Sequence, residues 1–207
     1  PYLEFMSECP YIDGVILDKR LPRWNLLYLL NLKKQLLRYS FTHVFDLQNS
    51  KRTKFYEKYI IPKAIWSSTE TALERGERKT DFDEDPVLDR MKIQLKKSGV
   101  KTKNVNNSNL NWAFTNIRHI TKNYISRKYI LLFPFCSQKL INKKWPYYSI
   151  LVSQLKSKYG GKYDIAIAPG PNEIEESRML STNVILDGEN PLKLNQLISL
   201  IKGASFI

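Results

Sequence analysis

Three polar clusters in this chain combine residue types that could bind an anion or a sugar. In the first cluster, Ser137 and Lys143 follow the apolar run 129–134. A hydroxyl and an ammonium group at the carboxyl end of a strand can hold a diphosphate through hydrogen bonds and a point charge. A surface turn with solvated lysines is the simpler interpretation, and it would be preferred if this cluster stood alone.

The second cluster is the turn Gly170-Pro171-Asn172-Glu173, which follows the short apolar run 164–168. A carboxylate at the start of a helix could accept hydrogen bonds from ribose hydroxyls. The alternative is that Glu173 only caps the helix and complements its dipole.

The third cluster lies in the first half of the chain, where residues 46–52 end a short apolar run. Asn49 and Arg52 could contact an anionic acceptor. Asp46 and Gln48 could simply stabilise the turn.

Alternating strands and helices are expected to position these clusters. In the second half, strands are predicted at 129–134, 164–168, 183–186 and from 204 onward, with helices at 146–158, 172–180 and 191–202. In the first half, strands are predicted at 15–17, 43–47 and 59–65, helices at 24–38 and 87–97, and an exposed loop at 67–85. Repeated strand–helix units predict an α/β fold with parallel sheets, which bind ligands beyond the carboxyl ends of their strands.

The composition predicts an anionic partner and argues against several other classes of site. Lys and Arg outnumber Asp and Glu by 33 to 20, a formal net charge of +13, and residues 101–128 contain no acidic side chain. This excess indicates attraction to an anion, unless it reflects only a lysine-rich composition with a solvated linker. Two distant cysteines and two isolated histidines argue against a disulfide framework, a structural zinc site and a histidine-based triad. No apolar run approaches the roughly 20 residues of a membrane span.

The order of the motifs resembles glycosyltransferase family 9, the lipopolysaccharide heptosyltransferases. Asp46-Leu47-Gln48 with Arg52 looks like the strand-end motif of the family's acceptor domain, and Lys143-Lys144-Trp145-Pro146 looks like its Lys-x-Trp-Pro donor motif. Ser137 and Glu173 fall at the family's hydroxyl and acidic donor positions. One departure is that Phe135 and Cys136 follow Pro134, where the family usually has a glycine.

The resemblance implies a GT-B-like pair of Rossmann-type domains, and we expect both to be incomplete. The expected boundaries are 1–112 for the acceptor-side domain, 113–128 for a basic linker or connecting helix, and 129–207 for the donor-binding domain. The implied reaction moves a heptose from a nucleotide diphosphate donor, ADP-heptose, to a lipopolysaccharide-type or other glycan acceptor. It would proceed with inversion and without a metal or other cofactor.

In this scheme the donor-binding residues are Ser137, Lys143 and Glu173, and the acceptor-binding residues are Asn49 and Arg52. The family's catalytic Asp would precede Pro1 and its Asp-(Thr/Ser)-Gly-Pro-x-His loop would follow Ile207, so we expect an inactive fragment truncated at both ends. The implied setting is bacterial and cytoplasmic, with peripheral contact at the inner membrane and no nucleic-acid partner.

Two other classes of protein share some of these features. A basic nucleotide- or nucleic-acid-binding α/β protein would account for the charge, but aromatic residues do not alternate with the basic ones at strand spacing. A nicotinamide-dependent oxidoreductase would share the fold class, but the chain has no Gly-x-Gly-x-x-Gly turn.

Overall fold

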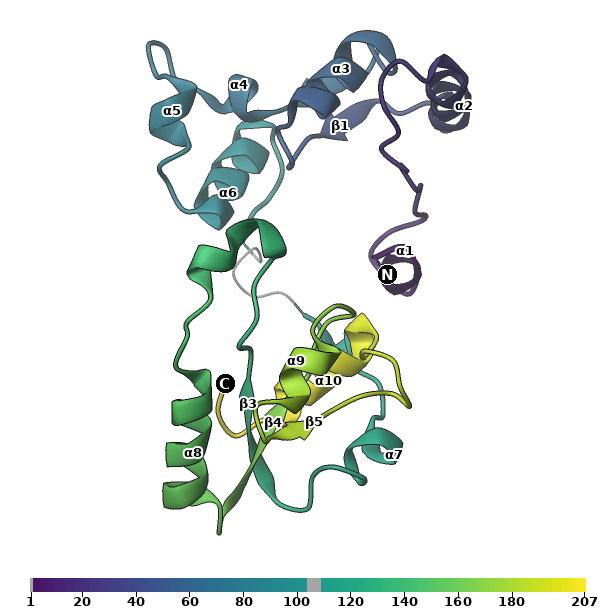
Figure 1. Ribbon diagram of the computed structural model, residues 1–207. Coiled ribbons are helices and arrows are strands. Elements are labelled where there is room, and N and C mark those ends of the chain that lie inside the picture. Colours follow the sequence, from purple (N-terminus) through teal and green to yellow (C-terminus); the bar gives the residue numbers. More distant parts are fainter. Residues whose placement is uncertain (1, 104–108) are drawn as a thin grey trace. The chain divides into compact units, whose positions relative to one another are not determined.

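The computed structural model of the chain describes residues 2–103 and 109–207 and divides it into two compact units (Figure 1). One unit is Leu17–Ser108, and the other combines Pro1–Ile16 with Asn109–Ile207. The division between the units falls between Ser108 and Asn109. The expected boundary at residue 112 and the expected linker at 113–128 stay predictions. Residues 104–108 of its Asn-rich approach lie outside the described part.

A parallel sheet with the strand order β3-β4-β5 forms the centre of the larger unit. These strands are β3 (Lys128–Leu132), β4 (Tyr163–Ile167) and β5 (Asn183–Val184). Ile130 pairs with Ile165 in β4, and on its other side it forms a parallel bridge to Phe206. The strand expected from residue 204 onward is present only as this bridge.

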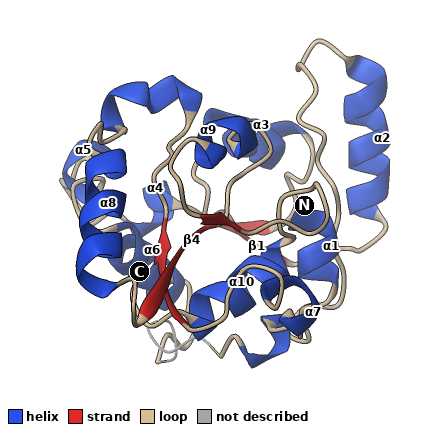
Figure 2. Cartoon of the chain, turned by 60° about the horizontal axis from the view of Figure 1, so that its bottom comes forward, coloured by secondary structure: helices blue, strands red, loops and turns tan. Residues whose placement is uncertain are grey.

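Helices cover both faces of this sheet, as an all-apolar strand requires. On one face, Ile130 and Ile165 pack against Val152 of α8 (Tyr148–Tyr159). On the other face, alternate strand residues pack against α10 (Leu194–Gly203) and α7 (Arg118–Thr121); this cluster contains Ile120, Tyr129, Leu131, Ala166, Ile185 and Leu200. Figure 2 shows β4 between α8 and α10. The α/β class with parallel sheets is confirmed.

The first residues of the chain belong to this larger unit, which the sequence did not predict. Glu4, in α1 (Tyr2–Ser7), forms an ion pair of 2.6 Å with Lys193. The ring centroid of Phe5 lies 4.9 Å from that of Trp112, in the short 3-10 helix η1 (Asn111–Ala113). The remaining elements of the unit are η2 (Gln138–Lys143) and α9 (Ile174–Arg178).

The smaller unit contains two parallel strands, β1 (His43–Phe45) and β2 (Ile65–Ser67). Its helices are α2 (Leu26–Leu37), α3 (Lys51–Tyr59), α4 (Thr69–Ala72), α5 (Lys79–Phe82) and α6 (Val87–Lys97). The predicted helices at 24–38 and 87–97 are confirmed as α2 and α6. The strand predicted at 15–17 is absent. Of the strand predicted at 59–65, Tyr59 belongs to α3 and only Ile65 belongs to a strand, β2.

The loop predicted at 67–85 was wrong in two stretches, because α4 and α5 interrupt it. Ser68 and Thr71 form a reciprocal capping box at the start of α4, with the Ser68 backbone N–H donating to Thr71 Oγ1 at 2.9 Å. Ala72 and Phe82 are buried, so both short helices are tied to the unit by apolar contact.

Candidate functional site

The donor residues predicted after β3 and β4 meet in one pocket. The pocket has a volume of about 500 Å³ and lies where these neighbouring parallel strands end. Ser137 lines it from the start of η2, and Glu173 lines it from the residue that precedes α9. Two predicted donor residues, 36 positions apart in the sequence, are therefore brought together by the pairing of β3 with β4.

Two lysines line this pocket, Lys139 and Lys144, whereas the prediction placed Lys143 there. Lys143 is exposed at the end of η2 and is not among the lining residues. Lys144 is half-buried, forms an ion pair with Glu176, and its Nζ lies 5.6 Å from the ring centroid of Phe135. A bound anion would compete with Glu176 for Lys144.

Glu173 has a structural role and also lines the pocket. Its Oε2 accepts a hydrogen bond of 2.7 Å from the backbone N–H of Gly170, which closes the turn after β4. A Cβ added at Gly170 would lie 3.1 Å from the same oxygen, so a side chain there would crowd the carboxylate. Glu173 occupies the N-cap position of α9, but its side chain accepts no hydrogen bond from the first N–H groups of that helix, so the capping interpretation was wrong. The carboxylate has further lone pairs for ligand hydroxyls.

An adjoining pocket of about 340 Å³ shares Lys144 and Phe135 with the first. Trp145, Pro146 and Tyr148 contribute to its wall. The ring centroids of Trp145 and Tyr148 lie 5.3 Å apart in an edge-on arrangement. Together the two pockets place a lysine, a hydroxyl and a carboxylate beside an aromatic surface, a combination suited to phosphate, ribose and a flat ring.

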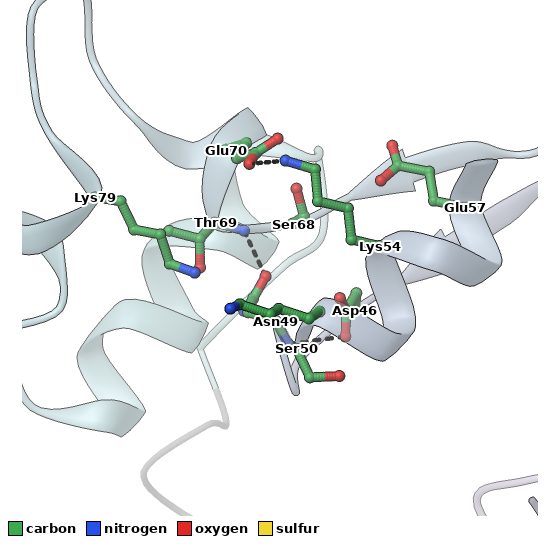
Figure 3. Close-up of a pocket in the computed structure, with 10 residues that line it drawn as sticks. Asp46, Asn49, Ser50, Lys54, Glu57, Ser68, Thr69, Glu70 and Lys79 are labelled. Carbon is green, nitrogen blue, oxygen red and sulfur yellow. Dashed lines mark hydrogen bonds and ion pairs between the residues drawn. The ribbon is translucent and has the colours of Figure 1, made fainter. Parts of the chain in front are cut away.

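The smaller unit has a comparable pocket of about 300 Å³ at the ends of β1 and β2 (Figure 3). Asn49 lines it from the turn after β1, and Ser68 and Thr69 line it from the turn after β2. Lys54 and Glu70 form an ion pair of 2.5 Å across it. Asn49 and Thr69 also line an adjoining pocket of about 460 Å³.

A hydrogen-bond network fixes Asn49 in this wall. Asn49 has a φ of 49°, in the left-handed region that asparagine tolerates better than most residues. Its backbone N–H donates to Asp46 Oδ1 at 2.9 Å, and its side-chain Oδ1 accepts from the Thr69 backbone N–H at 2.6 Å. Its Nδ2 donates to Oε1 of Gln94 in α6 at 3.1 Å. Asn49 therefore joins both strand ends to α6.

Gln94 completes this network from a position that is only 1% exposed. Its Nε2 donates to the carbonyl oxygens of Asp46 at 3.0 Å and of Ser67 at 2.9 Å. Asp46 directly follows β1 and Ser67 is the last residue of β2. One amide group therefore holds the two strands together at their carboxyl edge. Buried polar groups of this kind are costly when unpaired, so the network also fixes the shape of the pocket.

Arg52, the second predicted acceptor residue, does not line either pocket of this unit. Its Nε lies 3.4 Å from Asp18 Oδ2, and its Nη1 donates to the carbonyl of Leu21 at 2.9 Å. Its guanidinium also lies 5.3 Å from the ring centroid of Tyr56. Arg52 therefore holds the segment that precedes α2 against α3.

The Asp18 cluster perturbs the ionisation of its members. Burial, together with a hydrogen bond donated to Asp18 Oδ2 at 2.7 Å, raises the pKa of Tyr56 to about 12. For Asp18, burial acts to raise the pKa, but the hydrogen bonds from Tyr28 and Tyr56 outweigh it and the pKa is lowered. This cluster stabilises the unit, and its members do not line either of the two pockets described above.

Several pocket residues were not predicted as site residues. Lys144 was visible as half of a basic pair, but spacing alone cannot decide which of two adjacent lysines faces inward. Thr69 and Lys79 fall in the segment predicted to be a loop. The cap signal Ser68-x-x-Thr71 could have located Thr69.

Comparisons with protein-family models, curated proteins and solved structures found no match to this chain. Within residues 2–103 and 109–207, no group of three or more His, Cys, Asp and Glu side chains is arranged to hold a metal ion. Over the same residues, none of the helices has the length and apolar character needed to cross a membrane.

Proposed function

We propose that the chain is part of a heptosyltransferase-like glycosyltransferase that binds its nucleotide diphosphate sugar at the ends of β3 and β4. One observation carries the proposal: Ser137, Glu173 and Lys144 line one pocket at the carboxyl edge of a parallel sheet. This is the edge where open α/β sheets bind ligands.

Each part of the donor is bound by side chains of matching chemistry. Lys144 and Ser137 bind the diphosphate oxygens, and Glu173 accepts hydrogen bonds from ribose hydroxyls. The aromatic wall of the adjoining pocket, which includes Trp145, accommodates the base. In the transfer step, Lys144 stabilises the negative charge that develops on the departing nucleotide diphosphate.

The acceptor side of the proposal rests on the smaller unit. Asn49 lines a pocket at the ends of β1 and β2 that also contains Lys51, Lys54 and Lys79. The same pocket also contains the carboxylates of Asp46, Glu57 and Glu70, so its formal charges balance, and Lys54 is paired with Glu70. Donors and acceptors of this kind together suit the hydroxyl groups of a glycan acceptor, and Lys51 and Lys79 are available for an anionic substituent on it. Arg52 supports this unit from the Asp18 cluster and does not contact the acceptor. The two units then correspond to the acceptor and donor domains of a GT-B enzyme.

Adjacent lysines provide a matched test of the donor pocket. Lys144→Ala and Lys143→Ala remove the same charge from neighbouring positions, but only Lys144 lines the pocket. ADP binding, measured by calorimetric titration, should weaken about ten- to a hundredfold in Lys144→Ala, the loss of one charge-assisted hydrogen bond. Lys143→Ala should bind ADP almost as tightly as the unmodified chain.

Circular dichroism of each variant should match the unmodified chain, because neither lysine is in the apolar core. Equal losses in both variants would show that bulk charge, and not the pocket, attracts ADP. A chain that fails to bind ADP or ADP-heptose at millimolar concentration would refute the donor assignment.

A further inference from the structure

Helix α2 exposes a row of leucines on the side that faces away from its own unit. Its buried residues are Leu29 and Leu32. Leu26, Leu30 and Leu37 are 67%, 63% and 51% exposed, respectively. Three large exposed side chains on a helix that already buries a separate apolar side indicate a second apolar contact.

The spacing of these leucines places them in one stripe. Leu30 is four residues after Leu26, and Leu37 is seven residues after Leu30, close to one and two helical turns. The stripe therefore runs along most of the 12 residues of α2.

Basic residues accompany the stripe. Residues 19–38 include six Lys and Arg side chains, and no Asp or Glu. Lys34 and Arg38 are exposed, and neither forms an ion pair with any residue that the structure describes. Trp24, just before the helix, is 79% exposed. Leucines with lysine, arginine and an exposed tryptophan are typical of helices that lie in a membrane interface.

We propose that this face of α2, defined by Leu26, Leu30, Leu37, Lys34 and Arg38, binds the surface of an anionic phospholipid bilayer. The leucines enter the boundary between headgroups and acyl chains, and the basic side chains contact lipid phosphates. The helix lies along the surface, because 12 residues extend about 18 Å and the hydrocarbon core is about 30 Å thick.

Charge distinguishes this partner from a second copy of the chain. A symmetric dimer through α2 would gather the six cations of residues 19–38 from each copy at one interface, without acidic residues in 19–38 to neutralise them. An anionic lipid surface provides an apolar region for the leucines and phosphate groups for the cations. The proposal is independent of the donor pocket, which lies in the other unit.

Sedimentation of the full chain with lipid vesicles tests this surface. The vesicles are pure phosphatidylcholine, or phosphatidylcholine with about one third phosphatidylglycerol, a content that gives a strongly negative surface. The test variants are Leu30→Ala and Lys34→Ala. The matched controls are Ile150→Ala and Lys158→Ala, which remove an exposed apolar side chain and an exposed charge from α8.

The chain should partition onto the anionic vesicles and only weakly onto the neutral ones, with binding reduced by salt. Leu30→Ala should lower the partition coefficient about tenfold, because a leucine loses its burial in the acyl region. Lys34→Ala should lower it about fivefold, the contribution of one cation near an anionic surface. Both α8 controls should bind like the unmodified chain.

Three results would overturn the proposal. The first is equal binding to both kinds of vesicle, and the second is equal loss in the α2 and α8 variants. The third is a dimer, seen by analytical ultracentrifugation, that Leu30→Ala dissociates while vesicles fail to compete with it. That result would assign the stripe to a second copy of the chain.

Discussion

Replacing Gln94 with alanine should test whether one side chain holds the two strand ends of the smaller unit together. Gln94 in α6 donates to the carbonyl oxygens of Asp46 and Ser67 and accepts from Asn49. The substitution keeps the helix, since alanine has a high helix propensity. It removes all three of these hydrogen bonds at once.

The expected cost follows from the surroundings of these groups. Asp46 and Ser67 are buried, so their carbonyls would lose a partner where water has little access. Leaving a buried polar group unpaired costs about 1–3 kcal/mol. Asn49 lines a pocket, so water can replace its lost bond. The Ser67 carbonyl still accepts from the Asp46 N–H, so it loses one of two hydrogen bonds, whereas the Asp46 carbonyl is left unpaired. One unpaired carbonyl and one lost hydrogen bond together give a loss of about 1.5–4.5 kcal/mol in the free energy of unfolding.

Urea denaturation followed by circular dichroism measures this loss, with Gln35→Ala as the control. Gln35 is an exposed residue of α2, so the same chemical change there should shift stability by less than about 0.5 kcal/mol. Hydrogen exchange of the Asp46 amide, which donates to Ser67 O at 2.8 Å, provides a local measurement. If Gln94→Ala and Gln35→Ala unfold at the same urea concentration, the network does not hold the strand ends.

Two further predictions concern stability. The pKa of Tyr56 is raised from 10.0 to about 12 in the folded chain, so its stabilising contribution is present below pH 10 and is lost as the pH rises toward 12. Thermal unfolding scans should therefore show a midpoint that falls over this pH range, and Tyr56→Phe should reduce the fall. An equal fall in both proteins would assign it to other groups. A Cβ at Gly203 would lie 2.7 Å from the oxygen of the Tyr129 hydroxyl, which donates a hydrogen bond to the Leu200 carbonyl. Gly203→Ala should therefore lower the free energy of unfolding by about 1 kcal/mol. A loss of the same size in a Tyr129→Phe background would show that this hydroxyl is not the obstacle.

The regular elements of the larger unit could be predicted from local patterns. The apolar run at 129–134 predicted β3 (Lys128–Leu132), and the helix predicted at 146–158 overlaps α8 (Tyr148–Tyr159). Parallel order then predicts that the residues after β3 and β4 share an edge, so Ser137 and Glu173 could be expected to meet.

Long-range contacts and side-chain directions could not be predicted in this way. Arg52 is paired with Asp18, a residue 34 positions earlier in a segment without regular structure. The choice between Lys143 and Lys144 depends on the path of η2, which has non-helical angles at Leu140 (φ −128°, ψ 37°). Neither spacing nor composition contains that information.

The attachment of α1 to the larger unit has a consequence for folding during synthesis. Residues 17–108 form a continuous unit, so its internal contacts can be made as soon as this segment has left the ribosome. The ion pair between Glu4 and Lys193 instead joins residues 189 positions apart. Phe5 can meet Trp112 earlier, but residues 1–16 complete their contacts only after α10 has been made. Closing so large a loop is slow, so the N-terminal segment is expected to be the last to gain protection from proteases.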